Sequence, residues 1–165
     1  MSAIAAVDVG SNAIRLIVVE VVAGGSRTLD EQRYALRLGS DVFACGRLSA
    51  NTIAELQAIF SDIAARLARY GVTRYRAVAT SALRDAQNAS AVVEALRASS
   101  GVVLEVIDGN EEARLMRRAL LRAVGEPPSG MLLIDLGGGS LELARGPLQR
   151  SVSLPFGTVR PCSPP

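Results

Sequence analysis

The sequence predicts an α/β fold with a mixed β-sheet, because strands come first and helix and strand then alternate. An apolar run over residues 3–9 and another over residues 14–22 are separated by a short polar turn, which indicates a β-hairpin. From residue 51 onward, helical periodicity alternates with short β-branched runs. The 165 residues are 49% hydrophobic and 21% charged, a composition typical of a chain with a packed core rather than of a disordered one.

Local signals justify the remaining elements in order. A turn at residues 24–26 leads into residues 27–38, which extend the hairpin into a meander. Residues 51–70 predict a helix, because apolar side chains recur there at helical spacing: Ile53, Leu56, Ile59, Phe60, Ile63 and Leu67. Ser49 or Asn51 is expected to cap its start, and Gly71 to end it. The later elements predicted are a strand at 74–80, a helix at 89–99 that ends near Gly101, a strand at 102–107, and a helix from 111 to about 123 capped by Asn110.

The chain is expected to form one lobe and the beginning of another, with the first lobe over residues 1–125 and the second over residues 126–165. The 35 residues after Gly130 suffice for about three strands but not for a crossover helix, because a βαβ unit takes ~30 residues or more. Residues 161–165 cannot form a central strand, since proline lacks the N–H group that a strand ladder needs. We therefore expect apolar strand faces in the second lobe to be exposed or paired with another chain.

Two copies of one short pattern are the most informative local feature of the sequence. In each copy an apolar strand runs into an aspartate and then a turn of glycine and small polar residues, first at Asp8–Asn12 and again at Asp135–Ser140. Glycine lets backbone N–H groups approach a ligand closely, and the aspartate beside it is suited to hold a metal ion. The first turn is equally well explained as an ordinary hairpin turn. Three consecutive glycines at the second favour a phosphate cradle, and the pair of turns suggests two lobes that grip one phosphorylated substrate.

The sequence contains no lysine and no histidine. The missing lysine excludes a Walker-A phosphate loop, and the missing histidine excludes Ser-His-Asp and Cys-His catalysis as well as histidine-ligated zinc and haem. Carboxylates are left as the plausible acids, bases and metal ligands, and the 18 arginines as partners for phosphate. The net charge of +2 is too small to indicate nucleic-acid binding by itself.

Other candidate residues follow predicted strands or open a predicted helix. Thr80, Ser81 and Arg84 suit an oxyanion, although a plain helix N-cap with a surface arginine explains them equally well. Glu112 opens a helix, where compensation of the helix dipole is a sufficient explanation. Glu142 lies on the same strand face as Ser140, so that it and Asp135 would share a magnesium-bearing cleft; spacing alone favours a solvent-facing side chain.

Together these segments resemble one family, the Ppx/GppA phosphatases, which comprises exopolyphosphatases and guanosine pentaphosphate phosphohydrolases of the actin-like ATPase superfamily. The matching segments occur in the family's order: residues 7–12 with Arg15 and Leu16, 79–86 with Asn88, 109–115, 134–140 with Glu142 and Leu143, and 153–157 with Val159 and Arg160. The resemblance implies an actin-like (ribonuclease H-like) lobe with a mixed sheet, followed by the first strands of a second, incomplete lobe.

The resemblance also implies an activity, which is release of terminal phosphate from inorganic polyphosphate or from pppGpp, with Mg²⁺ as cofactor. In the family, the glutamate matched by Glu112 acts as base or positions the attacking water. The second turn grips phosphate and places magnesium, which makes Asp135 and Glu142 the metal residues. The residues implied to bind phosphate are Gly137, Gly138, Gly139 and Ser140, with Ser11, Asn12 and Arg84 completing the cage.

Family members continue well past the motif at residues 153–157 into a full second lobe, so we expect weak or absent activity from this chain alone. Two alternatives stay open: a non-catalytic protein of the same fold that binds phosphate or a partner, and a kinase or ATPase of the actin-like group. We expect polyphosphate or guanosine pentaphosphate as partner, neither a nucleic-acid polymer nor a membrane, and we leave a homodimer open. The start of the chain lacks the features of a signal peptide and the two cysteines lie far apart, which favours a cytoplasmic protein.

Overall fold

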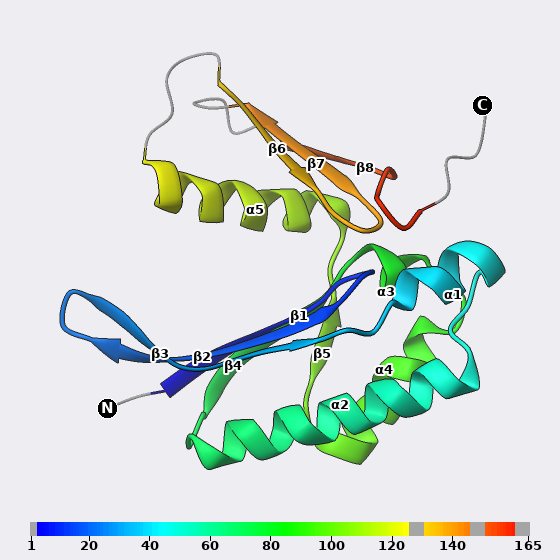
Figure 1. Cartoon of the computed structure of the whole chain (residues 1–165), viewed down its shortest axis with the longest axis horizontal. Coiled ribbons are helices and arrows are strands. Elements are labelled where there is room, and N and C mark those ends of the chain that lie inside the picture. Colours follow the sequence, from blue (N-terminus) through cyan, green and yellow to red (C-terminus); the bar gives the residue numbers. More distant parts are fainter. Residues whose placement is uncertain (1–2, 126–130, 146–150, 161–165) are drawn as a thin grey trace.

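The computed structural model describes residues 3–125, 131–145 and 151–160, and these residues form two β-sheets with five helices around them (Figure 1). The strands are β1 (Ala3–Val9), β2 (Ile14–Val22), β3 (Gly25–Tyr34), β4 (Arg74–Ala79), β5 (Leu104–Val106), β6 (Leu132–Leu136), β7 (Leu141–Arg145) and β8 (Ser151–Leu154). The helices are α1 (Leu38–Cys45), α2 (Ala50–Arg69), α3 (Ser81–Asp85), α4 (Ala89–Ser100) and α5 (Gly109–Val124).

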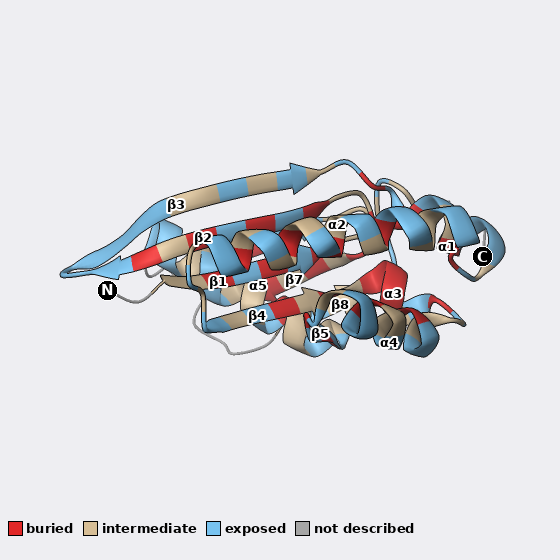
Figure 2. Cartoon of the chain, turned by 90° about the horizontal axis from the view of Figure 1, so that it is seen from below, coloured by how far each residue is buried: buried red, intermediate tan, exposed pale blue. Residues whose placement is uncertain are grey.

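The larger sheet has the strand order β3-β2-β1-β4-β5 and is mixed, as the sequence predicts. Strands β1, β2 and β3 form an antiparallel meander, whereas β4 and β5 run parallel to β1 and are reached through helices. Because side chains alternate along a strand, Val7, Val9 and Leu16 are buried in the core against the helical layer. Figure 2 shows buried and exposed positions along the strands. Asp8 and Arg15 point to the opposite face, on the side where the smaller sheet lies.

Helix α2 buries one apolar stripe against the larger sheet and packs beside α4. Leu56, Phe60 and Ile63 are fully enclosed, as their helical spacing predicts. Ser49 caps the helix by accepting a hydrogen bond from the Thr52 N–H at 3.3 Å, so that the second candidate cap, Asn51, lies within the helix. The core of the chain therefore lies between the lower face of the larger sheet and the α2–α4 layer.

The cap predicted for α5 was wrong by two residues. Asp108 has an extended backbone and its Oδ1 accepts a hydrogen bond from the Glu111 N–H at 2.8 Å, whereas Asn110 already lies in the first turn. An aspartate and an asparagine serve equally well as caps, so residue type alone did not separate the two positions. The helix consequently begins at Gly109, close to the end of β5.

Two short helices were not predicted. The meander ends at Tyr34 rather than continuing to residue 38, and α1 starts at Leu38. Helices α1 and α3 contain eight and five residues, too few to establish a helical period in the sequence. A tertiary contact fixes the start of α1, where the Gly39 N–H donates to the Ser11 carbonyl at 2.9 Å.

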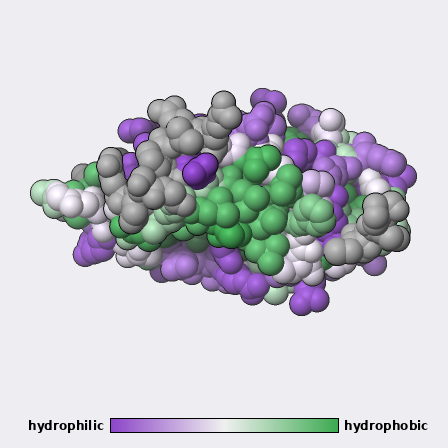
Figure 3. All heavy atoms as spheres, turned by 90° about the horizontal axis from the view of Figure 1, so that it is seen from above, coloured by the Kyte–Doolittle hydropathy of each residue, from purple (hydrophilic) through white to green (hydrophobic). Residues whose placement is uncertain are grey.

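The smaller sheet has the order β6-β7-β8 and packs on α5, which lies against β7 and β8 (Figure 1). Its outer face is apolar and exposed, as predicted: Leu132, Ile134 and Leu136 are between 54% and 58% exposed, and a continuous hydrophobic surface is visible there (Figure 3). Residues 126–130, where we place the lobe boundary, and the proline-rich residues 161–165 lie outside the described residues. The division of the chain at residue 125 therefore stays a prediction.

Across the described ranges, no helix combines the length and the hydrophobicity needed to cross a membrane.

Candidate active site

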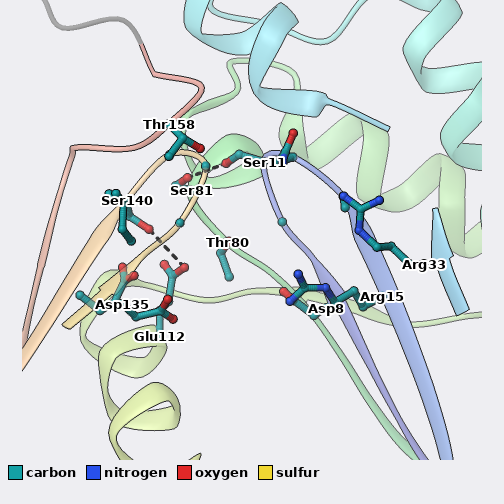
Figure 4. A pocket seen from close by; sticks show the side chains of 18 residues that line it. Asp8, Ser11, Arg15, Arg33, Thr80, Ser81, Glu112, Asp135, Ser140 and Thr158 are labelled. Atoms are coloured by element: carbon teal, nitrogen blue, oxygen red, sulfur yellow. Dashed lines mark hydrogen bonds between the residues drawn. The ribbon is translucent and has the colours of Figure 1, made fainter. Parts of the chain in front are cut away.

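A pocket of about 270 Å³ lies where the two aspartate-glycine turns meet (Figure 4). The turn between β1 and β2 supplies Gly10, Ser11 and Asn12 to its wall, and the turn between β6 and β7 supplies Gly137 to Ser140. Thr80 and Ser81 reach the pocket from the end of β4, and Glu112 from the first turn of α5. The structure thus brings together the turns that the sequence analysis paired, although they lie more than a hundred residues apart.

Glycine lets the two turns approach closely. A Cβ atom at Gly139 would lie 2.1 Å from Ser81 Oγ, 2.5 Å from Phe43 Cζ and 2.7 Å from Ser11 Oγ. A Cβ atom at Gly138 would lie 3.2 Å from the Cβ atoms of both Ser11 and Asn12. None of Gly137, Gly138 and Gly139 has a positive φ, so backbone conformation does not require glycine there, and it is at Gly139 that the neighbouring atoms leave no room for a side chain.

Buried hydroxyl groups connect four of the segments around the pocket in two pairs. Ser11 Oγ and Ser81 Oγ are hydrogen-bonded at 2.7 Å, which joins the first turn to the start of α3. Ser140, also buried, donates to Glu112 Oε1 at 3.3 Å and so joins the second turn to α5. The first contact thus fixes the β1–β2 turn against α3, and the second fixes the β6–β7 turn against α5.

Glu112 is held in place from two sides. The Arg84 guanidinium donates to Glu112 Oε2 at 3.0 Å and to the carbonyl of Ile107 at 3.1 Å, while Ser140 contacts the other carboxylate oxygen. Arg84 is not among the residues that line the pocket, although the sequence analysis assigned it to the phosphate cage. In this structure it contacts the candidate base instead. The ion pair with Arg84 and the contact with Ser140 fix the orientation of the Glu112 carboxylate.

Four carboxylates line the pocket: Asp8, Glu112, Asp135 and Glu142. Desolvation within the cleft raises the pKa of Asp8; the Arg15 charge opposes this increase, and the charges of Glu112 and Asp135 add to it. Burial raises the pKa of Glu142, against the hydroxyls of Ser140 and Ser153, and the same two neighbouring charges raise it further. The pocket therefore concentrates negative charge that only partly cancels against protein cations.

Asp135 and Glu142 are direct cross-strand partners on β6 and β7. Like charges in this position are destabilising unless something neutralises them. Glu142 is 2% exposed, which overturns the solvent-facing interpretation, and Ser153 Oγ donates to its Oε1 at 2.8 Å. Mg²⁺ prefers carboxylate oxygens as ligands, and Asp135 and Glu142 offer such oxygens in the pocket wall. Within the described ranges there is no group of three or more acidic, histidine or cysteine side chains that could hold a metal ion.

Sequence reasoning missed two cationic residues of the pocket wall. Arg15 and Arg33 both line the pocket and are directly opposite one another on β2 and β3, while Asp8 is opposite Arg15 on β1 (Figure 4). Strand alternation places Arg15 on the same face as Asp8 once the hairpin register is known. The sequence pattern did not place Arg33 on this face, because a register shift between Val18 and Val19 changes which β3 residues lie opposite those of β2.

The chain resembles known proteins over most of its length. Residues 17–162 match the model of the Ppx/GppA phosphatase family. The sequence is 34% identical over 157 residues to Exopolyphosphatase 1 of Mycobacterium bovis, a match that covers 93% of this chain and 46% of that protein. It is 35% identical over 171 residues to Exopolyphosphatase 2 of Mycobacterium tuberculosis, covering 97% of this chain and 54% of that one. The chain thus spans about half the length of the curated relatives it matches.

Solved structures share the fold. An exopolyphosphatase from Cytophaga hutchinsonii superposes with a TM-score of 0.89 at 26% identity, over 96% of this chain and 52% of the other. The Ppx/GppA family member from Aquifex aeolicus superposes with a TM-score of 0.82 at 30% identity, with the same coverage. These similarities confirm the predicted α/β fold of the actin-like ATPase type with a mixed sheet.

Proposed function

This chain belongs to the Ppx/GppA phosphatase family, and on that premise we propose that it contributes the phosphate-binding centre of a hydrolase that releases terminal phosphate from inorganic polyphosphate. The observation that carries the proposal is the meeting of two glycine turns and four carboxylates at one pocket. Phosphoryl transfer needs mainly positioning and charge neutralisation, and this pocket offers groups for both. Relatives named exopolyphosphatases favour polyphosphate as substrate, with pppGpp as the second candidate.

Each side chain has a defined part in this proposal. Glu112 positions the attacking water or accepts its proton, and Arg84 holds that carboxylate in its orientation. Ser11, Asn12 and the second glycine turn bind the phosphate through hydroxyl and backbone N–H groups. Asp135 and Glu142 would hold Mg²⁺, which when bound supplies positive charge to the phosphate oxygens.

The experiment is phosphate release from long-chain polyphosphate, pppGpp and ATP in the presence of Mg²⁺. Glu112→Gln keeps the size of the side chain and removes its basicity, so we expect the rate to fall by about 100-fold or more. Glu55→Gln is the matched control, because Glu55 is exposed on α2 and far along the chain from every pocket residue. Equal rates for Glu112→Gln and the wild type would remove Glu112 from the mechanism, and faster turnover of ATP than of polyphosphate would favour the kinase or ATPase alternative.

A second candidate function rests on a different observation, the exposed apolar face of the smaller sheet (Figure 3). A monomeric protein rarely leaves such a face uncovered, so a non-catalytic protein that binds phosphate and a partner chain is the competing proposal. Tripolyphosphate binding without phosphate release from any of the three substrates would support it.

A further inference from the structure

A segment after β8 hydrogen-bonds along the whole second glycine turn. The N–H of Thr158 donates to the Gly137 carbonyl at 3.0 Å, and the N–H groups of Val159 and Arg160 donate to the Gly138 carbonyl at 2.8 and 3.1 Å. The Arg160 side chain continues the series, since its Nε donates to the Gly139 carbonyl at 2.8 Å. Three consecutive glycine carbonyls are thus bound by one neighbouring segment.

This pairing determines the orientation of the peptide groups in the turn. In a trans peptide unit the N–H points opposite to the carbonyl of the preceding residue. With the three glycine carbonyls directed at residues 158–160, the N–H groups of Gly138, Gly139 and Ser140 point to the other side. Backbone N–H groups on one side of a turn suit an anion. The orientation of these N–H groups therefore depends on residues 158–160.

The Arg160 side chain also contacts helices α1 and α3. Its guanidinium forms an ion pair with Asp85 at the end of α3 and lies over the Phe43 ring of α1, 4.2 Å from the ring centroid. Only 22% of its side chain is exposed. Arg160 therefore connects α1, α3 and the second glycine turn, yet it is not among the residues that line the pocket.

The segment after β8 also contains a glycine, Gly157, at a position where a side chain would collide with the second glycine turn. A Cβ atom at Gly157 would lie 2.3 Å from the Gly138 carbonyl oxygen and 2.4 Å from the Gly139 nitrogen. The segment consequently packs directly on the peptide group between these two glycines.

We propose that Arg160 is a positioning residue that holds the second glycine turn in its anion-binding orientation by tying the Gly139 carbonyl to Asp85 and Phe43. The inference rests on the proposed phosphate-binding function of the pocket. Arg160 acts through the turn and does not touch the phosphate. A lysine would reach the carbonyl or the carboxylate but would lack the planar group that donates to both while stacking on the ring.

The test is titration of the ¹⁵N-labelled chain with tripolyphosphate, followed by backbone amide NMR. We expect Arg160→Met to weaken binding about tenfold, the size of one lost charge-assisted hydrogen bond. In Arg160→Met, the chemical-shift changes that tripolyphosphate causes at the amides of Gly138, Gly139 and Ser140 should be smaller than in the wild type. The changes at the amides of Gly10 and Ser11 should remain. Arg160→Lys should fall between Arg160→Met and the wild type. The matched control is Arg27→Met, which removes an arginine–carboxylate pair with Glu20 on the distant end of the hairpin and should bind like the wild type.

Asp85→Asn provides a second variant that leaves Arg160 in place, and it should weaken binding in the same direction by a smaller factor. Wild-type affinity in a folded Arg160→Met, or in Asp85→Asn if Arg160→Met does not fold, would overturn the proposal. A wild-type chain that does not bind tripolyphosphate would instead contradict the proposed function. In that case the ligand-free amide shifts of Gly138 to Ser140 decide: a change in Arg160→Met supports the positioning role, and identical spectra overturn it.

Discussion

The surroundings of Glu142 contain some groups that raise the pKa of its carboxyl group and others that lower it. Its side chain is 2% exposed, accepts a hydrogen bond from Ser153 on β8, and lies directly across from Asp135. Burial and the neighbouring charges both favour the neutral acid, while two serine hydroxyls favour the anion. A carboxylate kept under such conditions is typical of a site that a cation completes.

The protonation of Glu142 should make the stability of the chain depend on pH. Because its folded pKa is raised above the ordinary value of 4.5, its contribution to stability is full below that value and is lost as the pH rises through the folded pKa. Glu142→Gln stays neutral, so it should be more stable than the wild type at about pH 8 and lose that advantage toward about pH 4.

Thermal unfolding in a chelating buffer across this pH range measures the effect. Addition of Mg²⁺ at the upper end should stabilise the wild type more than Glu142→Gln, since the cation compensates a charge that the variant lacks. Glu94→Gln is the matched control, because Glu94 is exposed on α4 and does not line the pocket. A stability difference that does not change with pH would contradict the argument.

At the scale of single elements, α5 shows how a helix start positions a functional side chain. Asp108 caps the helix, and Glu112 follows one turn later, where it meets Arg84 and Ser140. Glu111, on the same turn, lies on the outer side and pairs with Arg76 and Arg114. Hydrogen bonds from these arginines lower the pKa of Glu111 to about 2. Two adjacent glutamates thus face different surroundings, and only Glu112 reaches the pocket.

Removal of the α5 cap should therefore affect the pocket as well as the helix. Asp108→Ala leaves the Glu111 N–H without its partner, at an expected cost of about 1 kcal/mol in the free energy of unfolding. Because the first turn then loosens around Glu112, tripolyphosphate binding or phosphate release should weaken too. Ser49→Ala removes the equivalent cap of α2, with a similar cost but no effect on the pocket. Equal effects of the two variants on binding would show that Asp108 contributes stability alone.

The limits of sequence reasoning are also clearest at this scale. Long periodic segments such as α2 and the β1–β2 hairpin were predicted well, because their apolar spacing is a local property. The missed features depend on contacts between distant segments: α1 forms where Gly39 meets Ser11, and Arg33 reaches the pocket because of a shift in strand register. The motifs predicted that the two glycine turns come together, as they do at the pocket, but they did not show that Arg84 pairs with Glu112.

Over the whole molecule, the two sheets differ in how well their faces are covered. The larger sheet packs one face on α2 and α4, whereas the smaller sheet packs one face on α5 and leaves the other in water. The register of β6, β7 and β8 places Ile134, Leu143 and Val152 side by side across that outer face. The same alternation that directs Glu142 into the pocket therefore directs these apolar side chains outward.

We expect this face to drive self-association of the isolated chain, because burial of apolar surface stabilises contact at roughly 25 cal/mol per Å². The double variant Ile134→Thr with Leu136→Thr places threonine, a residue that favours strands, at both positions and removes much of their exposed apolar area. It should therefore shift the chain toward monomer. Val103→Thr is the control, since Val103 is equally exposed but lies outside the smaller sheet. Sedimentation or light scattering over a wide range of concentrations measures the size. A wild-type chain that stays monomeric throughout, with unfolding as cooperative as that of the double variant, would show that the exposed face is tolerated without a partner and would remove the main support for the partner-binding alternative.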